Sequence, residues 1–177
     1  MAKPHRVHSS ERIYSGRVLS LRVDEIDHVR GGGTRKVEVV EHAGGVCIIA
    51  QPTPREIILV KQHRHAVEQD LWEVPAGMIE RGEPALETAK RELLEETGYR
   101  AQSFRPLWSI YTVPGYGQER IHFFVAEGLT EGEAQPEADE AFELRIWPVD
   151  EAWALVERDQ MRDSKTQIAL AWARSVR

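Results

Sequence analysis

The 177-residue sequence contains a single cysteine, Cys47, so it cannot form an internal disulfide. Such scarcity is typical of proteins from a reducing compartment. Cys47 follows Val46 and precedes two isoleucines, with no cluster of metal ligands nearby. We therefore expect it to be a small buried hydrophobic residue rather than a reactive or metal-binding thiol.

Long hydrophobic runs are also missing. No stretch approaches the ~18 consecutive apolar residues that a membrane helix needs. Residues 1–10 are polar and lack the apolar core of a signal peptide. These absences predict a soluble, cytoplasmic protein without a membrane partner.

An excess of positive charge is absent too. Acidic residues outnumber Lys and Arg by 29 to 23, and the formal net charge is -6. This balance excludes a general electrostatic attraction to nucleic acid. If the substrate is itself acidic, local Arg, Lys or metal ions must offset the repulsion.

What is present is the pattern of one mixed α/β (α+β) domain, with β structure in the first third. Short strands are predicted at residues 17–29, 35–42, 46–50, 56–60, 72–74, 104–113, 121–126 and 141–147. The first two are expected to form a hairpin around the glycines at 31–33. The acidic residues 131–140 are predicted to form a solvent-facing loop.

Three helices are predicted. The first runs from Pro84 to Thr97, because proline suits a first helical turn and glycine suits the position just past the last. Its apolar stripe is Leu86, Ala89 and Leu93. A second helix is capped by Asp150 and reaches about Asp159. The third covers residues 166–175, with Ile168, Ala171 and Trp172 facing inward.

The first helix carries a crowd of carboxylates. On a helix of about 100° per residue, Glu92, Glu95 and Glu96 fall on one sector beside the apolar stripe. Their repulsion favours a bound cation, and hard oxygen donors suit Mg²⁺, for which Mn²⁺ can substitute. Arg91 lies one turn before Glu95 and can fix carboxylate geometry. On the helix pattern alone, a solvated surface helix with interleaved charges is the favoured explanation.

The spacing over Gly77–Tyr99 resembles the Nudix box. Its fixed positions follow in order: Gly77, five residues, Glu83, seven residues, Arg91-Glu92-Leu93, one residue, Glu95-Glu96, one residue and Gly98. Tyr99 stands where the family more often has an aliphatic residue. The resemblance implies a Nudix fold, in which a mixed β-sheet lies between helices, here with an N-terminal β-sheet extension.

The rest of the chain resembles the ADP-ribose pyrophosphatase branch of that family. The similar segments are Trp72-Glu73-Val74-Pro75-Ala76-Gly77, Tyr111-Thr112-Val113-Pro114-Gly115, Gln62-His63-Arg64 and Asp163-Ser164-Lys165-Thr166. Pro114 lies sixteen residues beyond Gly98, a placement typical of the branch. This implies that residues 1–42 form a β arm that dimerises the protein, and that residues 43–177 form the hydrolase domain.

The resemblance also implies roles for individual residues. The expected metal ligands are Glu92, Glu95, Glu96 and the carbonyl of Ala76, with Glu83 in support. The expected catalytic residues are Arg91, Glu95 and a general base from the acidic loop, where Glu140 is the first candidate and Glu137 the second. Glu119, which follows the Pro114 turn, is a third candidate for the base. Ala138 stands where some relatives carry a useful glutamate. The expected substrate-binding residues are Arg35, Arg64, Glu73 and Pro114.

Local chemistry offers plainer explanations for the substrate-binding group. Arg64 suits a surface ion pair, Arg35 a solvated strand position, and Glu73 a strand carboxylate facing water. Pro114 suits an ordinary turn. His63 and His65 lack the spacing of a zinc site.

The implied reaction is magnesium-dependent hydrolysis of the diphosphate of a nucleoside diphosphate derivative, with ADP-ribose converted to AMP and ribose 5-phosphate by a homodimer. The alternatives are a hydrolase of another nucleotide sugar such as GDP-mannose, an enzyme that removes oxidised nucleoside triphosphates, and a Nudix-like binding domain without catalysis.

Overall fold

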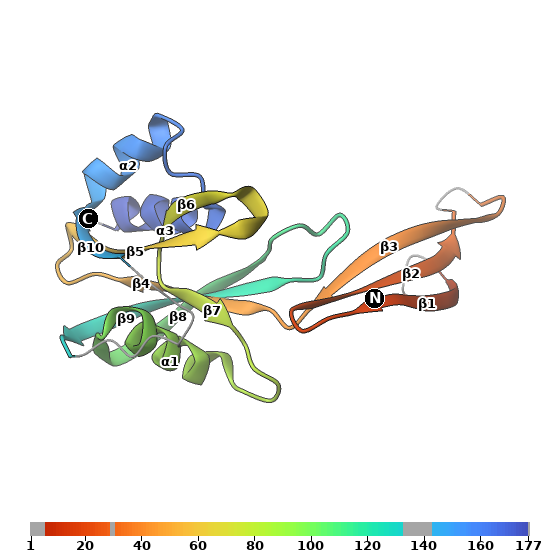
Figure 1. Ribbon diagram of the computed structural model, residues 1–177, viewed down its shortest axis with the longest axis horizontal. Coiled ribbons are helices and arrows are strands. Elements are labelled where there is room, and N and C mark those ends of the chain that lie inside the picture. Colours follow the sequence, from red (N-terminus) through yellow and green to blue (C-terminus); the bar gives the residue numbers. More distant parts are fainter. Residues whose placement is uncertain (1–5, 29–30, 133–142, 177) are drawn as a thin grey trace. The chain divides into compact units, whose positions relative to one another are not determined.

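The structure is a computed structural model that describes residues 6–28, 31–132 and 143–176. The strands are β1 (Val7–Ser15), β2 (Leu19–Asp27), β3 (Thr34–His42), β4 (Gly45–Ala50), β5 (Glu56–Arg64), β6 (Gln69–Glu73), β7 (Ala76–Met78), β8 (Arg100–Tyr111), β9 (Arg120–Thr130) and β10 (Glu143–Pro148). The helices are α1 (Ala85–Thr97), α2 (Val149–Glu157) and α3 (Ser164–Ser175), and the 3-10 turn η1 covers His65–Val67. Figure 1 shows these elements.

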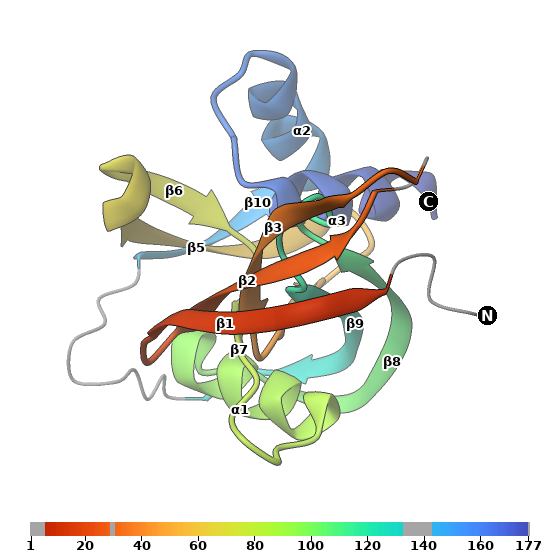
Figure 2. The same cartoon turned by 90° about the vertical axis from the view of Figure 1, so that its right-hand side faces the viewer.

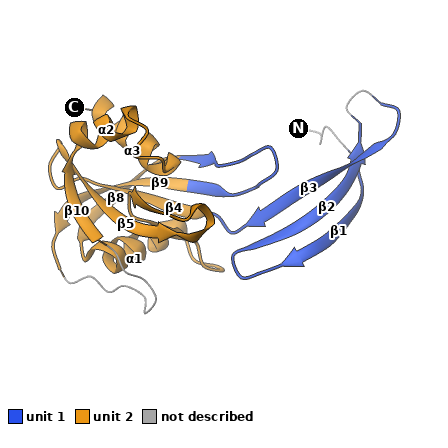
Figure 3. Ribbon diagram, turned by 45° about the horizontal axis from the view of Figure 1, so that its top comes forward, with its two compact units in different colours: residues 1–44, 109–121 blue, residues 45–108, 122–177 orange. Residues whose placement is uncertain are grey.

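The chain divides into two compact units (Figure 3). The first contains residues 1–44 together with residues 109–121. Its sheet has the order β1-β2-β3, and β2 pairs antiparallel with β3, as the hairpin prediction required. Residues 109–121 join this unit through Val40, whose N–H donates to the carbonyl of Tyr116 at 2.7 Å. The sequence pattern did not predict β1, because every residue of that strand is exposed and no alternation marks it.

The second unit, residues 45–108 and 122–177, contains the hydrophobic core. Its sheets have the orders β10-β5-β6 and β7-β4-β9-β8. Figure 1 shows α1 and α3 on opposite sides of β4, and Figure 2 likewise shows strands between these two helices, as the fold prediction expected. Strand β4 is buried over its whole length, and Cys47 within it is fully buried, which raises the pKa of its thiol well above the usual value.

Several details of the predicted helices are wrong. Leu86 is exposed, and the buried face of α1 is instead Ala89 and Leu93 with Thr88, Glu96 and Thr97. Asp150 does not cap α2, because Pro148 holds that position. In α3 Ala171 is exposed, and the buried residues are Thr166, Ala169, Leu170 and Ala173.

The end of α1 agrees with its prediction. Gly98 adopts the left-handed conformation at φ 76°, and its N–H donates to the carbonyl of Leu94. In the part of the chain that the structure describes, none of the helices is long and apolar enough to cross a membrane.

Candidate active site

Arg91 is the centre of a carboxylate cluster on α1. Its Nε and Nη2 donate to the two oxygens of Glu83, both at 3.1 Å, and Nη2 also contacts the carbonyl of Met78 at 3.4 Å. Its Nη1 donates to Glu95 at 2.9 Å and lies 2.8 Å from Glu92. One planar guanidinium thus fixes three carboxylates from two segments of the chain.

These contacts change the pKa of Glu83, which accepts two hydrogen bonds from Arg91. The hydrogen bonds from Arg91 lower the pKa of Glu83 to about 2. The same bonds raise the pKa of Arg91, so the pair stays fully ionised near neutral pH. Glu83 is therefore a fixed anion that orients Arg91, and its supporting role at the metal site stays a prediction.

Glu96 lies on the buried side of the same helix, where its residue is 5% exposed. One of its carboxylate oxygens accepts the N–H of Ala76 at 3.1 Å. Ala76 begins β7, which pairs antiparallel with β4. The helix and the segment before the box, predicted to supply ligands to one ion, are therefore in direct contact.

Gly77 is required for space rather than for backbone freedom. A Cβ built on this residue would lie 1.9 Å from both the carboxyl carbon and one oxygen of Glu92. Gly77 is not among the glycines with positive φ, whereas Gly82 is, at 84°. The strand β7 thus approaches the Glu92 carboxylate more closely than any side chain allows.

The donor set suits a hard divalent cation. Glu92, Glu95 and Glu96 offer only oxygen atoms, and Glu92 and Glu96 lie beside the Ala76–Gly77 backbone. Among residues 6–28, 31–132 and 143–176, however, no three acidic, His or Cys side chains are arranged so as to enclose an ion. Two of the three carboxylates, Glu92 and Glu95, contact the same nitrogen of Arg91. An ion at this place has to draw those two carboxylates toward itself.

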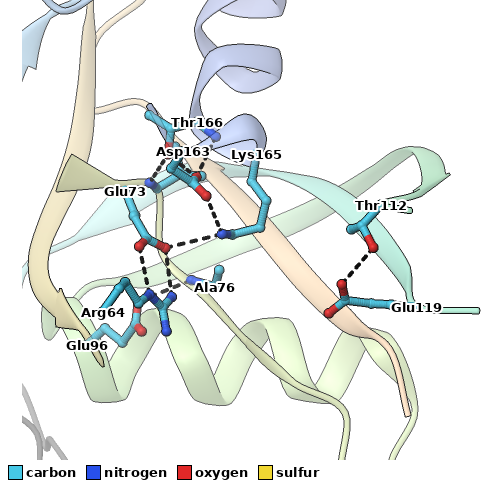
Figure 4. A network of polar contacts seen from close by, with 10 residues as sticks. Arg64, Glu73, Ala76, Glu96, Thr112, Glu119, Asp163, Lys165 and Thr166 are labelled. Carbon is cyan, nitrogen blue, oxygen red and sulfur yellow. Dashed lines mark hydrogen bonds and ion pairs between the residues drawn. The ribbon is translucent and has the colours of Figure 1, made fainter. Parts of the chain in front are cut away.

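A second ionic network links β5, β6 and the start of α3 (Figure 4). Arg64 donates from Nε and Nη2 to the two oxygens of Glu73, both at 2.7 Å. Lys165 donates to Glu73 at 3.2 Å and to Asp163 at 2.6 Å. Glu73 is 1% exposed, so it does not face water as the strand pattern alone suggested. Its hydrogen bond and charge raise the pKa of Arg64.

The same network caps α3. A carboxylate oxygen of Asp163 accepts from the N–H of Thr166 at 2.8 Å and from its hydroxyl at 2.7 Å. The Thr166 hydroxyl in turn accepts the N–H of Val74 at 2.9 Å. Val74 lies two residues before Ala76, the first residue of β7. The first turn of α3 therefore holds the segment that leads into β7, whose Ala76 carbonyl is a predicted metal ligand.

The remaining predicted residues lie in the other unit or outside the described part of the chain. Arg35 is an exposed residue of β3. Pro114 lies in a turn in which the carbonyl of Val113 accepts two backbone N–H groups, from residues 116 and 117. Glu119 accepts from Thr112 at 2.7 Å (Figure 4). Glu137 and Glu140 lie outside the described residues, and all of these roles stay predictions.

Sequence reasoning marked the segment 163–166 as similar to the branch but assigned no role to Lys165, Asp163 or Thr166. Their partners are up to 92 positions away in the chain, so no local periodicity connects them. The available signal was the position of Glu73 between the apolar residues Trp72 and Val74, since an acid that is buried requires a cation nearby.

The comparisons with known proteins agree with this architecture. The model of the NUDIX domain matches residues 41–169, and the chain belongs to that family. A relative from Bacillus methanolicus, named methanol dehydrogenase activator, is 41% identical over 165 residues, which are 92% of this chain and 89% of the relative. The ADP-ribose pyrophosphatase of Bacillus subtilis is 37% identical over 93% of this chain and 89% of its own length.

Among solved structures, the crystal structure of an ADP compounds hydrolase matches with a TM-score of 0.83. The match covers 97% of this chain and 92% of the other at 22% identity, and it therefore supports the fold alone.

Proposed function

We propose that this chain hydrolyses the diphosphate of ADP-ribose, yielding AMP and ribose 5-phosphate, with Mg²⁺ as the cofactor and Mn²⁺ as a substitute. Membership of the NUDIX family and the ADP-ribose pyrophosphatase relative support hydrolysis of a nucleoside diphosphate derivative. The observation that carries the proposal is the contact of the α1 carboxylates with the Ala76–Gly77 backbone.

The electrostatics of the cluster favour a bound cation. Three carboxylates, those of Glu83, Glu92 and Glu95, share the guanidinium of Arg91, which gives a formal charge of 3 × (-1) + 1 = -2. The carboxylate of Glu96 on the same helix brings the formal charge to -3. A diphosphate adds further negative charge and is repelled by this face of the helix unless a divalent ion joins it. Such an ion, when bound, neutralises phosphate oxygens and lowers the pKa of a coordinated water.

The proposed division of labour among the residues follows from their contacts. Glu92, Glu95, Glu96 and the carbonyl of Ala76 would hold the ion. Arg91 keeps the carboxylates in place and supplies part of their counter-charge. Arg64 would bind the diphosphate. A loop acid, first Glu140, would accept a proton from the attacking water.

The proposal includes a homodimer in which the β1–β3 sheet is the contact surface. Ile13 and Tyr14 are more than half exposed, and Val7 and Val18 nearly half. Apolar groups of this number on strand β1 and the β1–β2 turn suit a protein partner. In such a dimer, Arg35 and Pro114 would contribute to the substrate site.

The direct test is a substrate panel. ADP-ribose, GDP-mannose and an oxidised nucleoside triphosphate are incubated with the protein, with and without Mg²⁺, and phosphate is measured after coupling to a phosphatase. We expect magnesium-dependent turnover with ADP-ribose as the best substrate. Turnover of GDP-mannose at a higher kcat/KM contradicts the substrate assignment, and no turnover of any compound favours a binding domain.

The residue assignment is tested by Glu96→Gln, with Glu87→Gln as the matched control. Both glutamates lie on α1, but Glu87 is exposed and pairs with Lys90. Glu96→Gln keeps the shape of the side chain and removes its charge, so we expect turnover to fall by about 10²-fold or more while the helix stays folded. Wild-type rates in Glu96→Gln with Mg²⁺ present contradict the metal assignment.

A second candidate function follows from the Bacillus methanolicus relative, which is named for its effect on methanol dehydrogenase. It is tested by adding the protein to a methanol dehydrogenase and measuring the rate of methanol oxidation. Stimulation by the wild-type protein but not by Glu96→Gln would connect this effect to the same site.

A further inference from the structure

Lys165 is a buried cation that the proposed reaction does not use. It stands in the first turn of α3, where its side chain is 17% exposed. Burial opposes its charge, yet the carboxylates of Asp163 and Glu73 prevail and raise the pKa of Lys165. A buried charged lysine costs free energy unless it is paired with opposite charges, so the groups that Lys165 contacts indicate its role.

The first group that Lys165 fixes is the carboxylate of Glu73. One oxygen of Glu73 accepts from both Lys165 Nζ, at 3.2 Å, and Arg64 Nη2, at 2.7 Å. The other oxygen accepts from Arg64 Nε at 2.7 Å. Lys165 and Arg64 both donate to the Glu73 carboxylate, so Lys165 is a second group that restricts its rotation.

The second group is Arg64, through Glu73. The two hydrogen bonds from the Arg64 guanidinium to Glu73 use Nε and Nη2 and do not involve Nη1. The side chain of Arg64 is 41% exposed, whereas that of Glu73 is 1% exposed. The arginine therefore has one edge against a buried carboxylate and another toward solvent.

The exposed edge of Arg64 belongs to the surroundings of the carboxylate cluster. The charge of Glu96 contributes to the raised pKa of Arg64, and Glu96 bonds to Ala76. Figure 4 shows Arg64, Glu96 and Ala76 on the same side of Glu73, away from Lys165. A diphosphate held at the α1 carboxylates thus has Arg64 as a neighbouring cation.

We propose that Lys165 is a positioning residue, which acts through Glu73 to orient the Arg64 guanidinium toward the diphosphate of the substrate. The inference rests on the proposed function, since it takes the diphosphate as the ligand of Arg64. It assigns Glu73 to the support of Arg64 rather than to the substrate. Without Lys165, Glu73 is free to turn, and Arg64 loses its fixed direction.

The test is a double-mutant cycle with Lys165→Met, Arg64→Ala and the double variant. Lys165→Met keeps much of the side-chain volume and removes the charge. We expect its KM for ADP-ribose to rise by about tenfold or more, the effect typical of losing a group that orients a ligand, while kcat changes little. In the Arg64→Ala background the same substitution should leave KM unchanged, because there is no arginine left to orient.

Two further variants separate positioning from general damage. Lys61→Met removes a lysine of β5 that pairs with Asp70 and Glu143, and it should leave KM unaltered. Lys165→Arg retains a cation at the first turn of α3 and should restore most of the affinity. Equal rises of KM from Lys165→Met with and without Arg64 overturn the proposal, because they reveal an effect that does not pass through the arginine.

A measurement without substrate distinguishes this proposal from the proposed function. The Nε–H of Arg64, bonded to Glu73, should give a proton signal protected from exchange with water, assigned by its loss in Arg64→Ala. We expect Lys165→Met to remove the protection. If the wild-type protein hydrolyses nothing in the panel, the proposed function fails, but this signal still decides the positioning role. An unchanged signal in Lys165→Met refutes it.

Discussion

Replacing Gly77 by alanine should lower kcat strongly while it lowers the free energy of unfolding only a little. The new Cβ would lie 1.9 Å from the Glu92 carboxylate, whereas ordinary contact begins at 3.4 Å, so the two must part by 3.4 - 1.9 = 1.5 Å. Glu92 ends a flexible side chain and can rotate away, so we expect a stability loss of only ~1 kcal/mol, the lower end for overpacking. A displacement of about 1 Å at a reacting site costs roughly 10²-fold, so kcat should fall by about that factor or more.

The assay is phosphate release from ADP-ribose over a range of Mg²⁺ concentrations, together with denaturant unfolding of the same samples. Gly82→Ala is the matched control. Gly82 has φ 84° and no heavy atom within 4 Å of its virtual Cβ, so alanine there strains the backbone but displaces nothing. We expect it to lose about 1–2 kcal/mol of stability and to keep its kcat. If Gly77→Ala retains wild-type kcat at saturating Mg²⁺, the placement of Glu92 in the site is wrong.

Two other predictions concern stability. The folded-state pKa of Glu83 is lowered to about 2, so the contribution of its charge to the free energy of unfolding is full above the unfolded value near 4.5 and is lost as pH falls through 2. Glu83→Gln should therefore cost about 1–2 kcal/mol of stability at pH 7, after discount for solvent screening, and nothing once the pH is below 2. Urea unfolding at both pH values measures the difference. Asp163→Ala removes the cap on Thr166 and one anion beside Lys165, so a loss of ~2–4 kcal/mol at pH 7 is expected in the same assay. If Asp163→Ala loses less than ~0.5 kcal/mol, the value typical of a weak exposed N-cap, the buried Asp163–Lys165 ion pair contributes nothing to stability.

Local signals predicted α1 well. Pro84 and Gly98 mark its boundaries to within one residue, because both act through their own backbone geometry. The spacing of the acids also identified the cluster that Arg91 holds. Leu86 was misplaced because an apolar residue at helical spacing is not obliged to be buried.

The parts that sequence reasoning missed depend on distant partners. Glu73 is buried because Lys165 reaches it from 92 positions away, and neither residue alone carries that information. Strand β1 escaped prediction because both of its faces are exposed, so hydrophobic alternation is missing. The first compact unit combines residues 1–44 with 109–121, a union of segments that no linear pattern announces.

The hydrogen bond from Val74 to Thr166 has a consequence for the order of assembly during translation. The strand that leads into the Nudix box leaves the ribosome some ninety residues before the helix turn that holds it in place, since the two bonded residues are 92 positions apart. A nascent chain that ends before Thr166 can contain every glutamate of the box and still lack the hydroxyl that accepts the N–H of Val74, two residues before Ala76. Support for the segment that leads to Ala76 is thereby deferred until the chain has been made as far as the first turn of α3.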